Sequence, residues 1–257
     1  MSTLATKDLT IRFGGHVAVN AVTCSFEPGT LTAIVGPNGA GKTTYFNLIS
    51  GQLKATSGSV TLGGQDLTGQ SVSARTHAGL GRAFQLTNLF PNLSVLENVR
   101  LAVQATQEGK HRRGLNLWSI WSDHHALTER AESILQTVAM YERRDTPVAS
   151  LPHGDQRKLE VALLMALEPQ VYMFDEPTAG MSVDDVPVIL DLIRSLKARG
   201  DKTILLVEHK MDVVRELADR IIVLTNGTLV ADGPPAEVIA SPVVQEAYLG
   251  VTKEAAV

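Results

Sequence analysis

The chain has 257 residues, with 23 Lys and Arg against 27 Asp and Glu, a formal net charge of −4, and an apolar content of 44%. These values are typical of a globular chain, and the small negative charge gives no reason to expect nucleic-acid binding. No apolar run approaches the ~18 residues that cross a bilayer, and no basic-then-apolar signal segment is present. The single cysteine, Cys24, cannot form an internal disulfide. We therefore expect a cytoplasmic protein with Cys24 in its core.

The first part of the chain predicts strands. Residues 9–13 alternate and end at two glycines, and a second run, 17–26, ends at the turn signal Glu27-Pro28-Gly29. A short apolar strand follows at 31–35, and another is expected from residue 58, closing at Gly63 and Gly64. A candidate functional site follows directly after the run 31–35.

That site begins directly after the strand at 31–35. The eight residues there fit the phosphate-binding pattern G-x-x-x-x-G-K-[ST]: Gly36, Pro37, Asn38, Gly39, Ala40, Gly41, Lys42 and Thr43. The glycines let successive N–H groups point into one concavity, and the following helix adds its partial positive charge there. This helix is expected to turn Phe46, Leu48 and Ile49 inward and to stop at Gly51. The chain is therefore expected to bind a nucleoside triphosphate.

The rest of the chain predicts an α/β core interrupted by a helical insertion. Residues 93–167 are mostly helical in pattern, with apolar positions such as Ile134, Leu135 and Val138. Strand–helix alternation then returns, with buried strands at 171–174 and 203–207, a helix at 186–196, and a hairpin at 221–230 that turns at Asn226-Gly227. Continuous apolar strands between helices imply a parallel sheet covered on both faces.

Two features of the insertion leave alternatives open. The polar, basic stretch 108–114 is either a solvated loop or a contact for an acidic partner or lipid headgroups. Trp118 and Trp121, spaced i,i+3, either pack their helix onto a neighbour or form a partner-binding surface.

Two adjacent carboxylates end the strand at 171–174. Asp175 is expected to be the Mg²⁺ partner of Thr43, acting through waters that the metal retains. Glu176 is placed to polarise an attacking water as a general base. Pro177 then stops the strand.

Five motifs in this order resemble those of the ATP-binding cassette ATPases. They are 36–44, Gln85 after Gly81-Arg82-Ala83-Phe84, 151–157, 174–178, and Val207-Glu208-His209. The resemblance covers nearly the whole chain and implies a P-loop NTPase (RecA-like) core with an N-terminal antiparallel β subdomain and an inserted helical subdomain. Residues 1–257 would form a single cassette domain, with 1–88 and 160–257 as the nucleotide-binding core and 89–159 as the helical, signature-bearing part.

The resemblance also implies roles for individual residues. Lys42 and the amides of 36–44, including Thr44, would hold the phosphates of ATP. Thr43, Gln85 and Asp175 would place Mg²⁺ and the water, with Glu176 and His209 catalytic and Gln85 assisting. Phe13 would stack on adenine, although the residues alone favour a core or hairpin position. Two cassettes would dimerise head to tail, with the signature touching the partner's ATP: Leu151, Pro152, His153, Gly154, Asp155 and Gln156.

The signature departs from the family's usual Leu-Ser-Gly-Gly-Gln. Pro152 replaces the serine whose hydroxyl meets the partner's γ-phosphate, and proline has no N–H to substitute. Asp155 brings a negative charge to the glutamine position, where it can also stabilise the start of the following helix. The segment 179–182 lacks the usual final aspartate. We expect an intact ATP half-site in this chain and a weakened signature offered to the partner.

Several features are similar to the importers of branched-chain amino acids, in particular to the larger of their two ATPases. They include 13–15 with Ala18-Val19, 79–85, 93–99, the H-G-D-Q-R signature, Ala179-Gly180 and the tail 247–250. This resemblance implies a second, smaller ATPase, an external solute-binding protein, and two membrane permeases contacted by the Gln85 loop and the helical part. Leu86, Leu89 and Phe90 either take part in this docking or pack locally. The chain would lie on the cytoplasmic side of the membrane. Amide or urea import, lipopolysaccharide export, a soluble cassette in translation or repair, and a weakly hydrolysing regulatory subunit remain alternatives.

Overall fold

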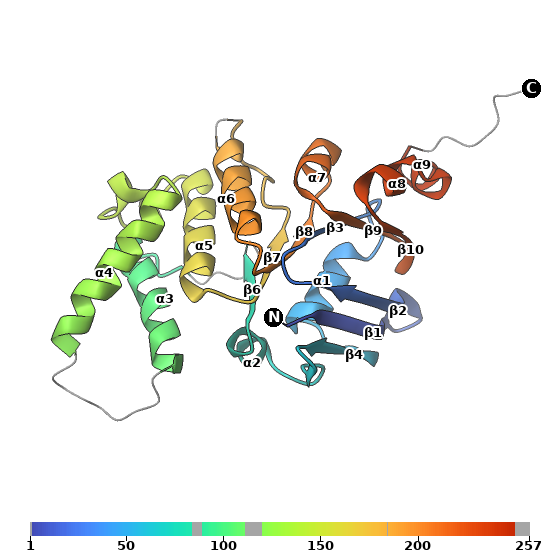
Figure 1. Ribbon diagram of the computed structural model, residues 1–257, viewed down its shortest axis with the longest axis horizontal. Helices are drawn as coiled ribbons and strands as arrows, with labels where there is room; N and C mark the ends of the chain where they lie inside the picture. Colours follow the sequence, from blue (N-terminus) through green and yellow to red (C-terminus); the bar gives the residue numbers. More distant parts are fainter. Residues whose placement is uncertain (1, 84–88, 111–119, 184, 250–257) are drawn as a thin grey trace, which may run out of the picture. The chain divides into compact units, whose positions relative to one another are not determined.

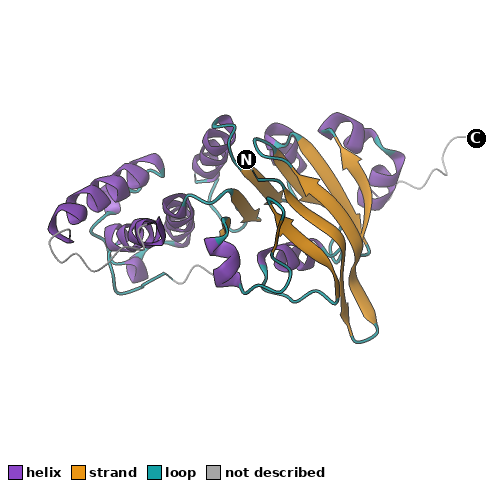
Figure 2. Cartoon of the chain, turned by 60° about the horizontal axis from the view of Figure 1, so that its bottom comes forward, coloured by secondary structure: helices purple, strands orange, loops and turns teal. Residues whose placement is uncertain are grey.

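The computed structural model describes residues 2–83, 89–110, 120–183 and 185–249. The chain forms two compact units. The strand-rich unit contains Met1–Leu80, Gln170–Glu176 and Lys197–Val257, and the helical unit contains Gly81–Pro169 and Pro177–Leu196. Figure 2 shows how strands dominate the first unit and helices the second. The helical unit contains the helical part expected at 89–159, and it also contains 81–88, 160–169 and 177–196, which were expected in the nucleotide-binding core.

An antiparallel sheet opens the strand-rich unit, in the order β2-β1-β4-β5. Its strands are β1 (Leu4–Phe13), β2 (His16–Phe26), β4 (Ser57–Leu62) and β5 (Gln65–Asp66). The pairing of β1 with β2 shifts register near Asp8 and Ala21, which both have a φ of 48°. Such irregularities bend a strand and increase its twist. The sheet is therefore expected to bend and twist at these positions.

A second sheet has the order β10-β9-β3-β8-β7-β6. Its strands are β3 (Leu31–Val35), β6 (Leu80–Ala83), β7 (Val171–Asp175), β8 (Thr203–Val207), β9 (Arg220–Thr225) and β10 (Thr228–Gly233). The chain passes into the helical unit within β6. The neighbours β9, β3, β8 and β7 pair in parallel, and β10 returns antiparallel to β9. The predicted parallel sheet and its terminal hairpin are confirmed.

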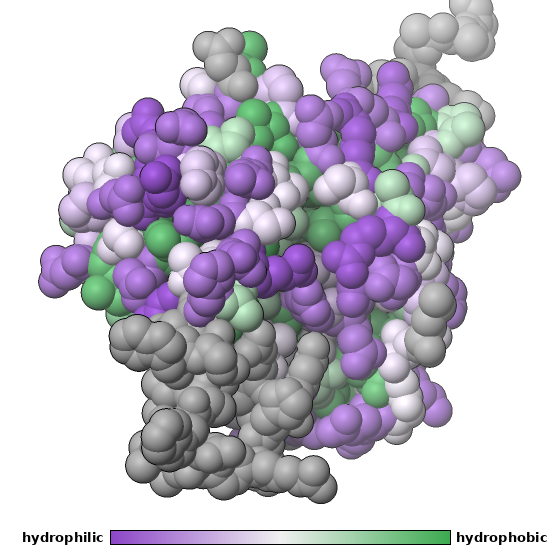
Figure 3. All heavy atoms as spheres, turned by 60° about the vertical axis from the view of Figure 1, so that its left-hand side comes forward, coloured by the Kyte–Doolittle hydropathy of each residue, from purple (hydrophilic) through white to green (hydrophobic). Residues whose placement is uncertain are grey.

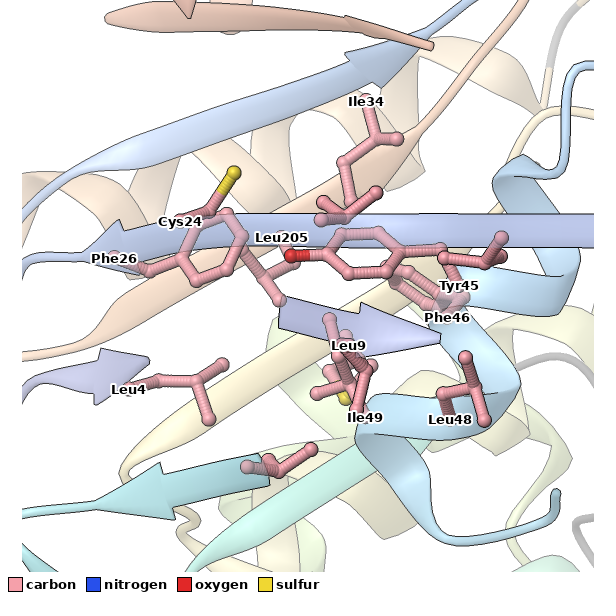
Figure 4. Packing of buried hydrophobic residues seen from close by; sticks show 14 of the residues in the cluster. Leu4, Leu9, Cys24, Phe26, Ile34, Tyr45, Phe46, Leu48, Ile49 and Leu205 are labelled. Atoms are coloured by element: carbon pink, nitrogen blue, oxygen red, sulfur yellow. The ribbon is translucent and has the colours of Figure 1, made fainter. Parts of the chain in front are cut away.

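Helices cover both faces of this second sheet. The strand-rich unit carries α1 (Lys42–Ser50), α2 (Val72–His77), α7 (Met211–Leu217), α8 (Pro235–Ala240) and α9 (Pro242–Leu249). Side chains of α1, including Tyr45 and Phe46, pack with Leu9 of the antiparallel sheet and with Ile34 and Leu205 of the parallel one (Figure 4). On the other face, Ala33 and Val35 pack against α7, α8 and α9. Cys24 is buried in the α1 cluster, as predicted.

The helical unit contains four helices and two short 3₁₀ turns among its described residues. They are α3 (Val95–Lys110), α4 (Ile120–Thr137), α5 (His153–Leu167), α6 (Val186–Ala198, whose last two residues lie in the other unit), and turns at Tyr141–Arg143 and Val148–Ser150. Ile134, Leu135 and Val138 are buried, as the helical periodicity predicts. On the face drawn in Figure 3, hydrophilic side chains are interspersed with small hydrophobic areas.

Candidate functional site

The phosphate loop lies between β3 and α1, at the carboxyl edge of the parallel sheet. Glycines take the backbone angles that the turn requires: Gly41, just before the helix, has a φ of 94°, and a Cβ there would lie 2.5 Å from the main-chain oxygen of Ala18. No side chain caps this helix end, and its first turn contains no acidic residue. The unsatisfied N–H groups and the positive end of α1 therefore face the loop, which suits a phosphate group.

Lys42 is folded back over the loop. Its Nζ donates hydrogen bonds to the main-chain oxygens of Gly36 at 2.7 Å and Pro37 at 2.9 Å. Burial lowers the pKa of this ammonium, and the neighbouring charges of Glu176 and Asp175 act in the opposite direction. The lysine thus has two weak carbonyl acceptors that phosphate oxygens could replace with stronger, charge-assisted ones.

The two carboxylates end β7 beside the strand that precedes His209. Asp175 pairs in register with Val207 of β8, and Val207 in turn pairs with Ile34 of β3. Because the carboxyl ends of parallel strands share one edge, the phosphate loop and both carboxylates meet there. Asp175 is buried, whereas the side chain of Glu176 is about two-fifths exposed. The two carboxylates therefore have different environments.

Glu176 and His209 are in direct contact. His209 Nε2 lies 2.7 Å from Glu176 Oε1, across 33 residues of sequence. Glu176 also has a φ of 51°, in the left-handed region that non-glycine residues rarely occupy, and its N–H donates to Val207 O at 2.9 Å. Backbone strain of this kind costs of order 1–3 kcal/mol and clusters at functional sites. The structure thus brings together Lys42, Asp175, Glu176 and His209 in the strand-rich unit.

The signature residues lie in the helical unit, at the start of α5. Leu151 is buried, and Gln156 Nε2 donates to its main-chain oxygen at 3.0 Å. Pro152 occupies the N-cap position and provides no side-chain cap, while Asp155 lies in the first turn. A carboxylate in a first turn complements the helix dipole, so the helix-stabilising position expected for Asp155 is confirmed.

The remaining predicted site residues fall at exposed places or outside the described residues. Phe13 ends β1 at the tip of the hairpin with 51% of its side chain exposed, so it is not a core residue. Phe90 is 53% exposed, and the amide of Asn98 is hydrogen-bonded to both its N–H and its carbonyl oxygen. Outside the described part lie Gln85, Leu86 and Trp118, the last four residues of the stretch 108–114, and Gly250.

Sequence reasoning missed the contacts of Asp155. Arg143, Lys158 and Asp185 surround the start of α5, through pairings that the motif pattern does not indicate. The available signal was local: Asp155 and Lys158 are spaced i,i+3, which places them on one face of a helix. Asp185, 27 residues beyond Lys158, carried no such signal.

Residues 19–179 match the family model described as ABC transporter, and residues 228–254 match the model described as branched-chain amino acid ATP-binding cassette transporter. The high-affinity branched-chain amino acid transport ATP-binding protein LivG of Escherichia coli K12 is 36% identical, over 96% of this chain and 97% of its own length. BraF of Pseudomonas aeruginosa, with the corresponding description, is 34% identical, over 96% of this chain and 97% of its own.

Solved structures agree with these relatives. A nucleotide-free ATP-binding cassette from an ABC transporter superposes with a TM-score of 0.80 at 29% identity, covering 98% of this chain and 100% of that one. An ABC transporter cassette in its ADP conformation gives 0.79, with the same identity and coverage. Among the described residues, no helix is both long and apolar enough to cross a membrane.

Proposed function

The chain belongs to the ATP-binding cassette family of transport ATPases, and from that premise we propose that it powers the import of branched-chain or closely related amino acids. The chain is an ATPase, and the contact of Glu176 with His209 beside the Lys42 loop supports hydrolysis at its own half-site. The match of residues 228–254 to the branched-chain amino acid cassette model supports the choice of solute.

We propose the following roles at this half-site. Lys42 and the amides of 36–44 bind the β- and γ-phosphates, and Phe13 stacks on adenine. A water attacks the γ-phosphorus, Glu176 accepts the proton, and the bond to ADP breaks to give ADP and phosphate. His209 holds the Glu176 carboxylate and orients the water toward the γ-phosphate.

The donor set at the loop fits Mg²⁺. Asp175 presents a carboxylate and Thr43 a hydroxyl, both hard oxygen ligands, whereas no three His, Cys, Asp or Glu side chains converge as a metal site among the described residues. We propose that Thr43 and Asp175, with Gln85, hold this ion, in part through water. When bound, Mg²⁺ neutralises charge on the phosphates.

The proposed assembly has a second cassette subunit, two membrane permeases on whose cytoplasmic side this chain docks, and an external solute-binding protein. No nucleic acid is involved. Residues 151–156 would touch the ATP of the second cassette, and the exposed Phe90, fixed by Asn98, supports a permease contact near Gln85.

Uptake of labelled leucine, isoleucine and valine tests the proposal, in cells or vesicles that contain the full complex. Lys42→Ala is expected to abolish ATP-dependent uptake, because it removes the cation that holds the phosphates. Lys54→Ala is the matched control, because Lys54 is an exposed lysine four residues beyond the end of α1 in sequence. Uptake that survives Lys42→Ala would contradict the proposal, and uptake only of urea or amides would reassign the solute.

One observation favours a second candidate, a weakly hydrolysing regulatory subunit. Pro152 begins α5 without the hydroxyl or N–H that would meet a partner's γ-phosphate. Retained uptake in a Glu176→Gln complex would favour this candidate, and loss of uptake would favour the ATPase engine.

A further inference from the structure

Two segments of the helical unit that are far apart in sequence lie against each other. One is the start of α5, which carries the signature residues, and the other is Asp185, immediately before α6. Figure 1 shows α5 and α6 side by side. The backbone approach is close: a Cβ on Gly154 would lie 2.6 Å from Asp185 Oδ2. Glycine at this signature position therefore makes room for the Asp185 carboxylate.

A chain of ion pairs connects the two segments. Lys158 Nζ lies 2.6 Å from Asp185 Oδ1 and 3.4 Å from Asp155 Oδ1, and Arg143 Nη1 lies 2.9 Å from Asp155 Oδ2. The other oxygen of Asp185 accepts a hydrogen bond from Ser182 Oγ at 2.7 Å. Ser182 ends the segment 179–182, and its Oγ accepts a further bond from Asp185 N–H at 3.2 Å.

The side chains at the centre of these ion pairs are largely removed from solvent. The exposed fraction is 11% for the Lys158 side chain, 13% for Asp155 and 28% for Asp185. Burial alone would lower the pKa of Lys158, but its hydrogen bonds and the charges of Asp185 and Asp155 raise it. The pKa of Asp185 is lowered, first by the hydrogen bond from Lys158 and then by that from Ser182. Removing one member would strand a partly buried charge, which is costlier than losing a surface pair.

These ion pairs also balance the negative charge of Asp155. Two cations, Arg143 and Lys158, balance two anions, Asp155 and Asp185, so the cluster has no net charge. The carboxylate that replaces the family's glutamine is therefore already paired within its own chain. Its two oxygens point to Lys158 and Arg143 and need no compensation from a partner subunit.

We propose that Asp155, Lys158 and Asp185 fasten the segment 179–182 to the signature, so that both meet the second cassette's ATP as one rigid piece. Lys158 and Asp185 are positioning residues in this proposal, because they act on the partner's nucleotide through the segments they hold. The inference rests on the proposed ATPase assembly for its functional consequence. The fastening itself is a property of this chain alone.

Two measurements on the full chain test the proposal. The first is hydrogen exchange without nucleotide, in wild type, Lys158→Met and Asp185→Asn, of the main-chain amides of Asp185 and Val186, which both donate to Ser182 O. Both variants are expected to exchange these amides at least about tenfold faster, since local opening no longer breaks the ion pair. Arg130→Met, which removes the Arg130–Glu168 pair at the far end of α5, is the matched control and should leave exchange of these two amides unchanged. Unchanged exchange in both test variants overturns the fastening.

The second measurement is the steady-state ATPase activity of the chain assembled with its second cassette and the two permeases. Lys158→Met is expected to lower kcat about tenfold or more while the KM for ATP stays within about twofold, because the chain's own phosphate loop is untouched. Lys158→Arg, which keeps the charge, should restore most of kcat. Faster exchange with an unchanged kcat would overturn the positioning role of Lys158 but not the assignment as an ATPase. A wild-type complex without ATPase activity would contradict the proposed function but not the fastening. If Lys158→Met does not fold, Asp185→Asn and Lys158→Arg decide the same question.

Discussion

Two glycines of the phosphate loop should respond very differently to the same added methyl group. Gly39 and Gly41 both have positive φ values, 79° and 94°, so alanine at either site costs about 1–2 kcal/mol for the left-handed conformation. A Cβ on Gly39 meets nothing within 4 Å, whereas one on Gly41 lies 2.5 Å from Ala18 O. That oxygen belongs to the backbone of β2 and cannot swing away. The overlap should add about 1–3 kcal/mol, as overpacking does.

Gly39→Ala should therefore lower the free energy of unfolding by about 1–2 kcal/mol and Gly41→Ala by about 2–5 kcal/mol. Urea denaturation of the nucleotide-free chain, followed by circular dichroism, measures both. The slope with denaturant should stay constant, so that midpoints report stability directly. Equal losses in the two variants would refute the reasoning, because they would mean that Gly41 is not held against β2 as the structure has it.

The remaining predictions concern a hydroxyl, a guanidinium and an ion pair. Tyr45→Phe should cost about 1 kcal/mol in urea denaturation, because it leaves the buried hydroxyl of Thr6, 2.7 Å away, without that partner. Arg75→Met should cost about 2–4 kcal/mol by the same assay, because the buried guanidinium donates to four main-chain carbonyls, two of them at the end of α1; a loss below about 1 kcal/mol would contradict that role. The Lys158–Asp185 pair should contribute a constant stability at neutral pH. Its contribution should be lost in acid, as pH falls below the ordinary pKa of an aspartate and through the lowered pKa of Asp185, and lost in alkali, as pH rises above the ordinary pKa of a lysine and through the raised pKa of Lys158.

Much of the fold can be predicted from patterns among residues that are neighbours in sequence. The apolar run 31–35 predicts a strand, and the glycines after it predict a turn. The spacing of Phe46, Leu48 and Ile49 predicts a buried helix face. The structure confirms all three. The stop at Gly51 is also confirmed, because Gly51 takes the left-handed conformation that ends α1. Each of these signals needs only neighbouring residues.

Other elements carried weaker signals. The first strand starts at Leu4, although the alternation of apolar residues predicts it only from residue 9, because the irregularity near Asp8 interrupts the period of two. The short strand β6 contains Gly81, which lowers strand propensity, so its sequence did not predict a strand. Bulges and glycines break the periodicity on which such predictions depend.

Long-range contacts of the candidate site could not be predicted from the sequence, for a different reason. That Asp175 and Glu176 end a strand was readable, but the left-handed φ of Glu176 and its 2.7 Å contact with His209 depend on how β7 and β8 pair. The pairing of Lys158 with Asp185 depends in the same way on how the residues before α6 pack against α5. Charge at a motif position predicts chemistry only once its neighbours in space are known.

Phosphate release from ATP by the full chain, wild type against Glu176→Gln, tests the central claim most directly. The account predicts that the variant still binds ATP, because Lys42 and the loop amides are unchanged, while phosphate release falls by about 10²–10⁴-fold with the loss of the general base. Nucleotide binding measured on the same samples separates the two effects. Phosphate release within a few-fold of wild type, with ATP bound, would contradict the assignment of hydrolysis to the site formed by Lys42, Asp175, Glu176 and His209.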